Sequence, residues 1–279
     1  MAELSAQLVK ELRDKTGAGM MDCKKALTET AGDLEAAIDH LRKKGAATAA
    51  KKAGREAREG LIAQAILPGA KTGVLVEVNC ETDFVAKNDG FRQFCDDIAR
   101  KIAAEPAVDL EPDRVAAISK IGENVVIRRH QRFEVTGSGL VAAYIHTGGK
   151  VGVLVEVGAS SEASTSREEF KQLVRDITLQ IAAANPVSVD RTALDAALLD
   201  RERAVYRDQV QGKPPNIIEK IVEGKMEKFY GTSCLVDQAF IKNPDQTVSN
   251  LVEATGKALG EKLEIRRFVR FNVGEEIAA

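Results

Sequence analysis

The sequence predicts an α+β protein in which two related halves follow a small helical module. The main observation is an internal repeat with an offset of 79 residues. ILPGAKTGVLVEV at 66–78 returns as IHTGGKVGVLVEV at 145–157, and FRQFCDDIARKIAA at 91–104 returns as FKQLVRDITLQIAA at 170–183. Two matches at one offset indicate that one α+β unit occurs twice in the chain.

A third match closes each half and shows where the second half is longer. VIRRHQRFEV at 126–135 pairs with EIRRFVRFNV at 264–273 at an offset of 138, so the second half carries 59 additional residues before its last strand. In each half, two short β-rich runs flank a glycine-containing loop and predict a β-hairpin. The segment that follows has one apolar face at helical spacing. We therefore expect two small antiparallel sheets with helices on one face, at 60–138 and 139–279.

Residues 1–45 are predicted to form three short helices. The first ends at the TGAG turn and carries leucines at every fourth position, Leu4, Leu8 and Leu12. Asp22 is expected to cap the second helix and Asp33 the third, which we expect to stop at Gly45. Residues 46–59, AATAAKKAGREARE, then form a basic, helical linker. Because no aromatic side chains are interleaved there, a solvated linker is favoured over an RNA contact.

The additional residues of the second half predict an inserted antiparallel helical hairpin at 190–230. Its turn is Gly212-Lys213-Pro214-Pro215, with a proline placed to start the second helix. A C-terminal helical segment is expected at 234–260, with Asp245 or Thr247 at the start of its helix and Gly260 near its end. A projecting hairpin serves contacts with other chains, as a self-association surface or a partner site; a packed-down helix pair is the alternative.

Charge and composition restrict the classes of function. The chain has 40 basic and 42 acidic residues, so no chain-wide attraction draws it to nucleic acid or to an anionic membrane. No apolar stretch has the length of a membrane span, and the N-terminus has the pattern of an amphipathic helix rather than a signal peptide, which predicts a cytoplasmic protein. The cysteines lie far apart and are expected to be buried, reduced thiols: Cys23, Cys80, Cys95 and Cys234.

Residues for catalysis are not grouped in any recognisable motif. The sequence shows no nucleophile motif and no metal-ligand spacing among its histidines, His40, His130 and His146. Gly69-Ala70-Lys71-Thr72 lacks the spacing of a phosphate loop, so we expect no bound nucleotide, metal or other cofactor. Glu77 and Glu156 recur at equivalent repeat positions, which indicates a structural role on the strand. The arginine pairs at 128–129 and 266–267 are interpreted as charges on the sheet surface.

The two halves differ most just after their matching strands. The first half continues as NCETDFVAKN at 79–88, whereas the second continues as GASSEAS at 158–164. Phe84 therefore stands beside Asp83 on a strand-to-helix loop, where binding groups are commonly displayed. The alternative is that Phe84 packs under its own helix. Met20 and Met21 lie at the turn before the second helix, and at least one of them is expected to pack in the core.

Four motifs together resemble the bacterial elongation factor Ts family. They are TGAGMMDCKKAL at 16–27, NCETDFVAKND at 79–89, KPPNIIEKIVEGKMEKFY at 213–230 and RRFVRFNVGE at 266–275. With the twin GVLVEV hairpins, the resemblance runs almost from end to end of the chain.

This resemblance implies a non-enzymatic guanine nucleotide exchange factor for elongation factor Tu, the GTPase that delivers aminoacyl-tRNA to the ribosome. It implies that the N-terminal module is ubiquitin-associated-like and docks on the nucleotide domain of the partner. Asp83 and Phe84 would be the intruding pair, with Phe84 inserted between helices of that domain so that its magnesium and phosphate contacts are disturbed, while the region around His146 would grip another domain. The implied partner-binding residues are Met20, Met21, Thr82, Asp83, Phe84, Val85 and His146.

Two other classes of function remain open. A protein-interaction scaffold would bind partners without any effect on nucleotide, and it would not need Asp83 or Phe84. An RNA-binding factor would use the basic linker and the paired arginines, and its affinity would depend strongly on salt.

Overall fold

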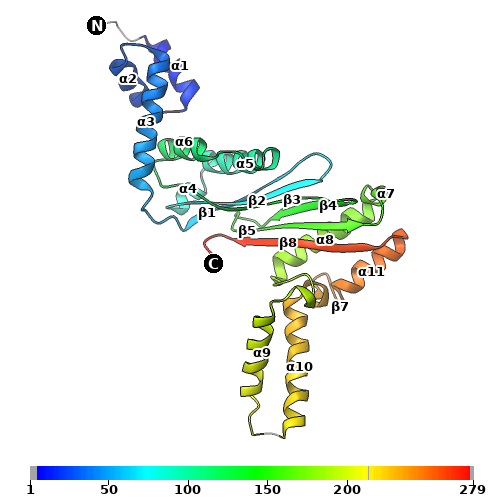
Figure 1. Ribbon diagram of the computed structural model, residues 1–279. Coiled ribbons are helices and arrows are strands. Elements are labelled where there is room, and N and C mark those ends of the chain that lie inside the picture. Colours follow the sequence, from blue (N-terminus) through cyan, green and yellow to red (C-terminus); the bar gives the residue numbers. More distant parts are fainter. Residues whose placement is uncertain (1–4, 213, 277–279) are drawn as a thin grey trace.

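The computed structural model describes residues 5–212 and 214–276, and it has the α+β class that the repeat predicts. Figure 1 shows the helical module at one end, two small sheets in the middle and a helical hairpin projecting away from them. Within the described residues, no helix is both long enough and apolar enough to span a bilayer.

The N-terminal module contains three helices around a core of Leu12, Cys23 and Leu27: α1 (Ala6–Thr16), α2 (Met20–Glu29) and α3 (Leu34–Lys52). Asp33 caps α3 as predicted, because its Oδ1 accepts from the Ala36 amide at 3.0 Å. The predicted cap at Asp22 is wrong. The N-cap of α2 is Gly19, and Asp22 lies in the first turn and bonds to Lys44 Nζ at 2.6 Å. Leu4 lies outside the described residues.

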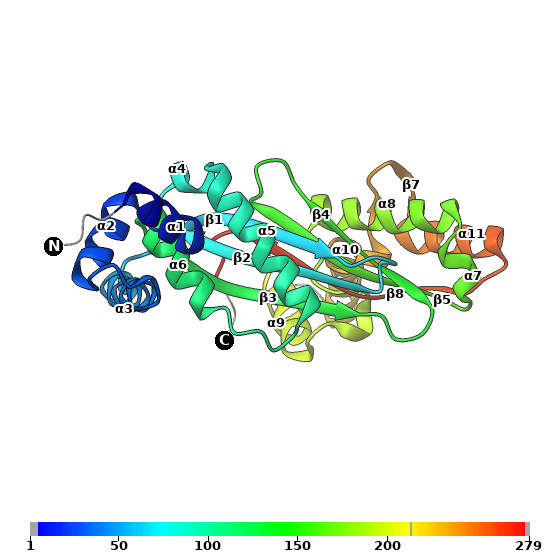
Figure 2. The same ribbon diagram turned by 90° about the horizontal axis from the view of Figure 1, so that it is seen from above.

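The first half folds into a three-stranded antiparallel sheet of order β1-β2-β3, with helices on one face. Its elements are β1 (Glu59–Ile66), β2 (Thr72–Cys80), α4 (Asp83–Ala86), α5 (Asp89–Ala104), α6 (Glu111–Ile121) and β3 (Val126–Glu134). Seen from above, α5 lies across the strands of this sheet (Figure 2). Phe91, Ile98 and Ile102 of α5 pack against β2. Since the other face of β2 meets the second half, every residue of β2 is buried, and the run GVLV at 73–76 is continuously apolar.

The second half repeats this plan with the order β4-β5-β8. Its repeated elements are β4 (Gly139–Ile145), β5 (Val151–Ala159), α7 (Glu162–Thr165), α8 (Glu168–Ala184) and β8 (Leu263–Asn272). Phe170, Ile177 and Ile181 of α8 cover β5 as the equivalent residues of α5 cover β2. The predicted hairpin, helix and closing strand are therefore confirmed in both halves.

The third helix of the module does not stop at Gly45, and this prediction is wrong. Gly45 is buried where α3 contacts α6: a Cβ added there would lie 3.0 Å from Ser119 Oγ and 3.2 Å from Val115 Cγ1. Glycine at this position lets the two helices approach closely, and it does not end the helix. Residues 46–52 of the predicted linker are consequently the last turns of α3.

The additional residues of the second half include the predicted helical hairpin. The insertion contains a 3-10 turn (Arg191–Ala193), α9 (Ala196–Asp208), α10 (Pro215–Ser233), a second 3-10 turn (Leu235–Asp237), β6 (Ala239–Phe240), β7 (Asn243–Thr247) and α11 (Val248–Leu259). Pro215 begins α10 as expected, and Lys213 lies outside the described residues. Val222, Met226 and Tyr230 form a small core at the base of the hairpin. Its predicted contact with another chain stays a prediction.

The expected helical segment at 234–260 is α-helical only from Val248 onward, after the short 3-10 turn at Leu235–Asp237. Thr247 caps α11 by accepting from the Asn250 amide at 3.2 Å, and Gly260 ends it in the left-handed conformation with φ 70°. Asp245 lies instead in β7. Ile241 and Lys242 form the turn between β6 and β7, which pair as two short antiparallel strands before the helix.

The two halves are joined by hydrogen bonds between repeat-equivalent atoms, with donor and acceptor exchanged between the halves. This exchange gives the repeat an internal pseudo-twofold relation. The equivalent pairs are Ile62 N with Gly149 O (2.7 Å) and Val141 N with Ala70 O (2.8 Å), then Lys150 Nζ with Gly60 O (3.0 Å) and Lys71 Nζ with Gly139 O (2.9 Å).

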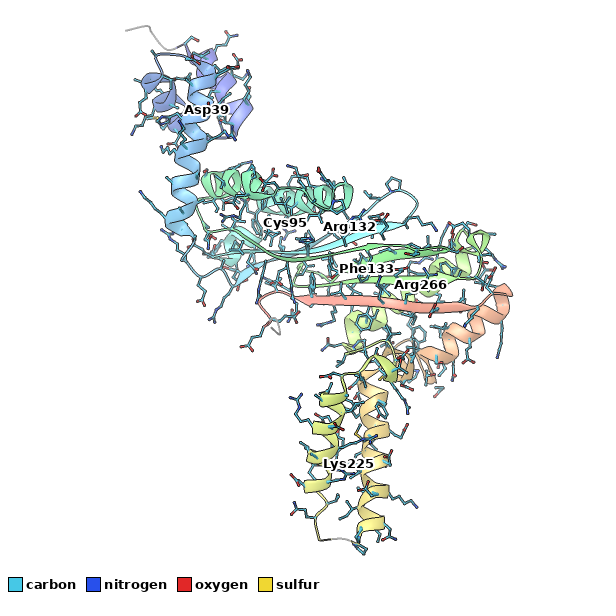
Figure 3. The ribbon with its side chains drawn as sticks, in the orientation of Figure 1. Asp39, Cys95, Arg132, Phe133, Lys225 and Arg266 are labelled. Atoms are coloured by element: carbon cyan, nitrogen blue, oxygen red, sulfur yellow. The ribbon has the colours of Figure 1, made fainter. Side chains whose placement is uncertain are left out.

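An apolar layer fills the space between the two sheets. It consists of Ile62, Leu75, Phe133, Val141, Leu154 and Phe271. Gly73 and Gly152 occupy equivalent places at its centre, where an added Cβ would lie 2.6 Å from Val141 Cγ1 and 2.5 Å from Ile62 Cγ2, respectively. Phe133 and Arg266 are labelled in this region in Figure 3. The sheets therefore pack at a distance that only glycine permits at these two positions.

Each half buries one glutamate under two consecutive arginines. Glu77 bonds to Arg128 and Arg129, and Glu156 bonds to Arg266 and Arg267. A β-bulge follows each glutamate, so two successive arginines reach the same carboxylate instead of pointing to opposite faces. The structural role predicted for the glutamates is confirmed. The four arginines are partly exposed, as expected for charges on the sheet surface, but they also pair with the buried carboxylates, which the sequence analysis did not predict.

Candidate functional site

The turn after β2 displays Phe84 to solvent. Thr82 is the N-cap of the single-turn helix α4, and its Oγ1 accepts from the Val85 amide at 3.4 Å. Ala86 is buried and Val85 packs partly against the core, whereas 81% of Phe84 is exposed. The alternative in which Phe84 packs under its own helix is therefore wrong. An exposed phenylalanine on a short turn fixed to a buried strand is a candidate for insertion into a partner.

Asp83 places a negative charge beside this ring. Lys87 Nζ lies 2.6 Å from Asp83 Oδ2, one helical turn along the chain. The hydrogen bond from Lys87 holds the pKa of Asp83 below its usual range. The carboxylate is consequently ionised at neutral pH, and it stays accessible at the surface.

A carboxylate from another loop holds the start of this turn. Glu123, between α6 and β3, accepts from the amides of Glu81 and Thr82 through Oε2, both at 3.0 Å. Its Oε1 accepts from Thr82 Oγ1 at 2.6 Å. The internal repeat in the sequence did not lead us to predict a role for Glu123. The pattern that could have indicated one is the Gly-Glu pair that precedes the third repeat match in both halves, at 122–123 and 260–261.

Met20 and Met21 are the first residues of α2, and each is more than half exposed. The expectation that one of them packs in the core is wrong, because the small core of the module is already filled by other side chains.

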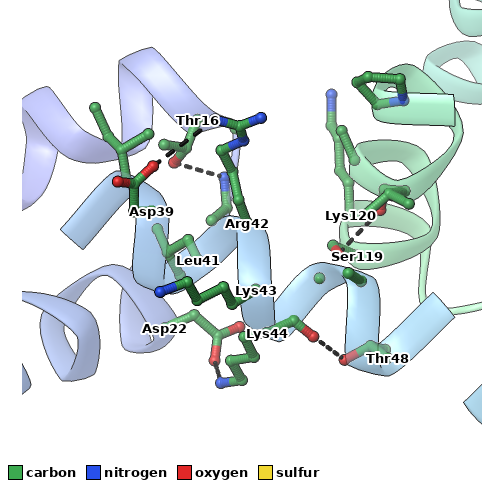
Figure 4. Close-up of a pocket in the computed structure, with 18 of the residues that line it drawn as sticks. Thr16, Asp22, Asp39, Leu41, Arg42, Lys43, Lys44, Thr48, Ser119 and Lys120 are labelled. Atoms are coloured by element: carbon green, nitrogen blue, oxygen red, sulfur yellow. Dashed lines mark hydrogen bonds and ion pairs between the residues drawn. The ribbon is translucent and has the colours of Figure 1, made fainter. Parts of the chain in front are cut away.

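A groove of about 830 Å³ lies between this module and α6, lined by the Gly17–Gly19 turn, by α3 and by α6. Figure 4 shows the Asp22–Lys44 ion pair and Lys120 on its walls.

His146 lies on the turn between β4 and β5, 3.0 Å from Tyr144 Oη through Nδ1. Together with Arg92 and Asp96 of α5 it lines a cavity of about 240 Å³ where the two halves meet. The structure thus brings His146 of the second half beside α5, the helix that directly follows the Phe84 turn. Met20 and Met21 belong to the separate helical module.

The cysteines and Lys71 take part in the packing and bonding of the fold. The four cysteines are buried free thiols. Burial raises the pKa of Cys80 to about 12, and burial also raises the pKa of Cys95. Lys71 of the Gly69–Thr72 loop bonds to Glu162 and to a backbone carbonyl of the second half. Among the residues that the structure describes, no group of three or more His, Cys, Asp or Glu side chains could hold a metal ion.

Comparison with known proteins identifies the family. The family profile described as "Elongation factor TS" matches residues 81–275, from the turn that carries Phe84 to the end of β8 and just beyond. The chain belongs to the elongation factor Ts family. It is 47% identical to elongation factor Ts of a Nostoc species over 297 residues, covering 99% of this chain and 94% of that protein. It is 45% identical to elongation factor Ts of Clostridium novyi over 290 residues, covering 98% and 93%.

A third elongation factor Ts, from Nitratidesulfovibrio vulgaris, is 43% identical over 281 residues, covering 99% of this chain and 98% of that protein. These three relatives extend the match beyond the family profile to the N-terminal helical module. The likeness to elongation factor Ts therefore includes all the surfaces on which the candidate residues lie.

Proposed function

We propose that this protein is a guanine nucleotide exchange factor for elongation factor Tu in the cytoplasm. It binds the GDP-bound GTPase and accelerates GDP release during translation elongation, by disturbing the magnesium and phosphate site. It catalyses no bond cleavage of its own and binds neither nucleotide nor nucleic acid directly. Family membership supports the choice of partner and activity.

The observation that carries the mechanism is the exposed ring of Phe84 beside an ionised Asp83. Insertion of this pair into the nucleotide domain would add a large apolar group and a negative charge near the bound nucleotide. A negative charge competes with phosphate for the same cationic contacts, so it weakens the hold on GDP. Met20, Met21 and His146 are proposed to bind the partner on either side of this insertion.

The energies show that Phe84 cannot act alone. A thousandfold faster release requires the dissociation barrier to fall by about 4 kcal/mol. Burial of one phenylalanine ring supplies roughly 1.5 to 3 kcal/mol. The module and the second half must therefore contribute through their own contacts. Because linkage is reciprocal, bound nucleotide must weaken the binding of this protein by the same free energy.

The test is the release rate of fluorescently labelled GDP from elongation factor Tu of the same organism, with this protein added at substoichiometric concentration. Release of the entire labelled pool would support a recycling exchange factor. Binding without any acceleration would refute the proposal and favour a protein-interaction scaffold.

Phe84→Ala sharpens this test. We expect release to slow by roughly 10- to 100-fold, which corresponds to the loss of one buried ring. The variant should still form the complex, and its free energy of unfolding should change by less than about 0.5 kcal/mol because the ring is exposed. Val187→Ala removes another exposed apolar side chain, in the loop after α8, and serves as the matched control. An unchanged rate in Phe84→Ala would rule out the insertion mechanism.

A further inference from the structure

We propose that Glu123 is a positioning residue for nucleotide exchange: it fixes the backbone at the start of the turn that carries Phe84, and its neighbours Gly122 and Asn124 tie this turn to the end of α3 and the residues that follow it. The inference rests on the proposed function, because it assigns a role in the exchange reaction. Glu123 itself does not need to touch the partner, and it acts through the orientation of Phe84.

The first step is the set of bonds that Glu123 makes. Its carboxylate accepts hydrogen bonds from two backbone amides and one hydroxyl between the end of β2 and the start of α4. Thr82 links Glu123 to α4, because its hydroxyl donates to Glu123 and accepts from the Val85 amide. Hydrogen bonds to a charged acceptor are shorter and stronger than neutral ones, and bonds in a chain strengthen one another.

The second step is the reciprocal contact between the two loops. Glu81 Oε1 accepts from the Asn124 amide at 2.6 Å, so each loop supplies a carboxylate to the backbone of the other. Asn124 Nδ2 donates to Arg55 O at 2.8 Å, and Lys52 Nζ donates to Gly122 O. The 122–124 loop therefore contacts both the Phe84 turn and the chain that leaves the N-terminal module.

The third step is the weakness of α4 on its own. A helix of four residues cannot sustain itself, because nucleation fixes several dihedral angles for one hydrogen bond. Phe84 is exposed, so its direction depends chiefly on the backbone of this turn. Loss of the Glu123 bonds would let the turn fray in the free protein. The partner would then have to order the turn during binding, at a cost in conformational entropy.

The repeat supplies a control of the same chemistry. Glu261, the repeat equivalent of Glu123, accepts through Oε1 from the hydroxyls of Ser161 and Ser164 at the start of α7. Ala163 stands on α7 where Phe84 stands on α4. A carboxylate thus supports a short helix in both halves, but only one of these helices carries an aromatic side chain.

The experiment compares Glu123→Gln with Glu261→Gln in the full chain. Glutamine keeps the size of the side chain but removes the charge and one acceptor. We expect Glu123→Gln to raise hydrogen exchange of the Glu81 and Thr82 amides about tenfold in the free protein, as expected for weakening bonds to a charged group. It should lower the maximal GDP release rate by a similar factor and change the half-saturating concentration less. Glu261→Gln should alter neither the hydrogen exchange of the Glu81 and Thr82 amides nor the maximal GDP release rate.

Two further comparisons separate positioning from a general loss of stability. In a Phe84→Ala background, Glu123→Gln should add little further loss of release rate, because its effect passes through Phe84. Thr82→Ser, which keeps the hydroxyl, should retain a higher rate than the isosteric Thr82→Val. The positioning role would be overturned if Thr82→Ser and Thr82→Val lost the same fraction of the GDP release rate. It would also be overturned if Glu123→Gln caused its full loss of release rate in the Phe84→Ala background.

The failures are distinguishable. No acceleration of GDP release by the unsubstituted protein would overturn the proposed function and, with it, the role of Glu123 in exchange. Unchanged amide hydrogen exchange at Glu81 and Thr82 in Glu123→Gln would overturn only the anchoring role of Glu123. The proposed function would still stand if the unsubstituted protein accelerated GDP release.

Discussion

Replacement of Glu77 by alanine should be among the most destabilising single changes in the body of the protein. Glu77 has no exposed surface and accepts from four donors: Arg128 Nη1 (3.1 Å), Arg129 Nε (2.8 Å), Asn79 Nδ2 (3.2 Å) and Gly274 N (2.9 Å). Two of these donors are charged, and one comes from the chain that follows β8. Removal of the carboxylate therefore leaves unpaired groups in both halves.

The magnitude follows from the solvent exposure of these partners. Removing one partner of a buried ion pair costs about 3 to 5 kcal/mol. The side chains of Arg128 and Arg129 are 27% and 18% exposed, so water recovers part of the loss and the lower end applies, about 3 kcal/mol. Such a loss corresponds to a fall in Tm of roughly 6 to 12 °C in a protein of this size.

Glu156→Ala provides the comparison within the same molecule. Glu156 accepts from two donors, Arg266 Nη1 at 2.9 Å and Arg267 Nε at 2.7 Å, and Arg267 is 46% exposed. We expect a smaller loss of about 2 kcal/mol. Urea unfolding followed by circular dichroism and thermal scans would measure both variants. A loss below about 1 kcal/mol for Glu77→Ala, or a larger loss for Glu156→Ala, would refute the reasoning from donor count and exposure.

Two further predictions concern packing and thiols. Gly73→Ala and Gly152→Ala should each lower the free energy of unfolding by about 1 to 3 kcal/mol, and by similar amounts, because the added methyl meets equivalent atoms between the sheets; urea unfolding checks this, and a neutral result at either site would contradict the close packing. Cys80 and Cys95 should not react with a thiol reagent at pH 8 until the protein unfolds, because burial disfavours the thiolate. Rapid labelling of the native protein would contradict the burial of these thiols. Since the pKa of Cys80 is raised from 9.0 to about 12, the stability that its protonated thiol contributes should be lost as pH rises across that interval.

The sequence was sufficient to predict most of the fold because its patterns are local. The repeat located both hairpins, and the apolar faces of α5 and α8 were visible as helical periodicity. Predictions failed where a distant element decides the outcome. Gly45 looks like a helix end until α6 is known to lie against it. Consecutive arginines look like alternating surface charges, and their pairing with one buried carboxylate is evident only when the bulge in the strand pairing is seen.

The candidate site was predictable in part for the same reason. Phe84 was found because it is the aromatic residue that distinguishes otherwise similar segments, but its exposure depends on tertiary structure. Met20 was misjudged because burial of methionine is only a statistical tendency. Glu123 lies 41 residues from Thr82, and no local pattern predicts which carboxylate will reach a given turn.

The interlocking of the two halves has a mechanical consequence for the proposed reaction. A hinge motion between the sheets would have to break backbone hydrogen bonds on both sides of the pseudo-twofold axis and separate the apolar layer packed around Gly73 and Gly152. The body should therefore transmit force as one stiff piece. Contacts made by the second half of the chain would then be able to hold Phe84 against a resisting nucleotide domain, without relaxation inside the factor itself.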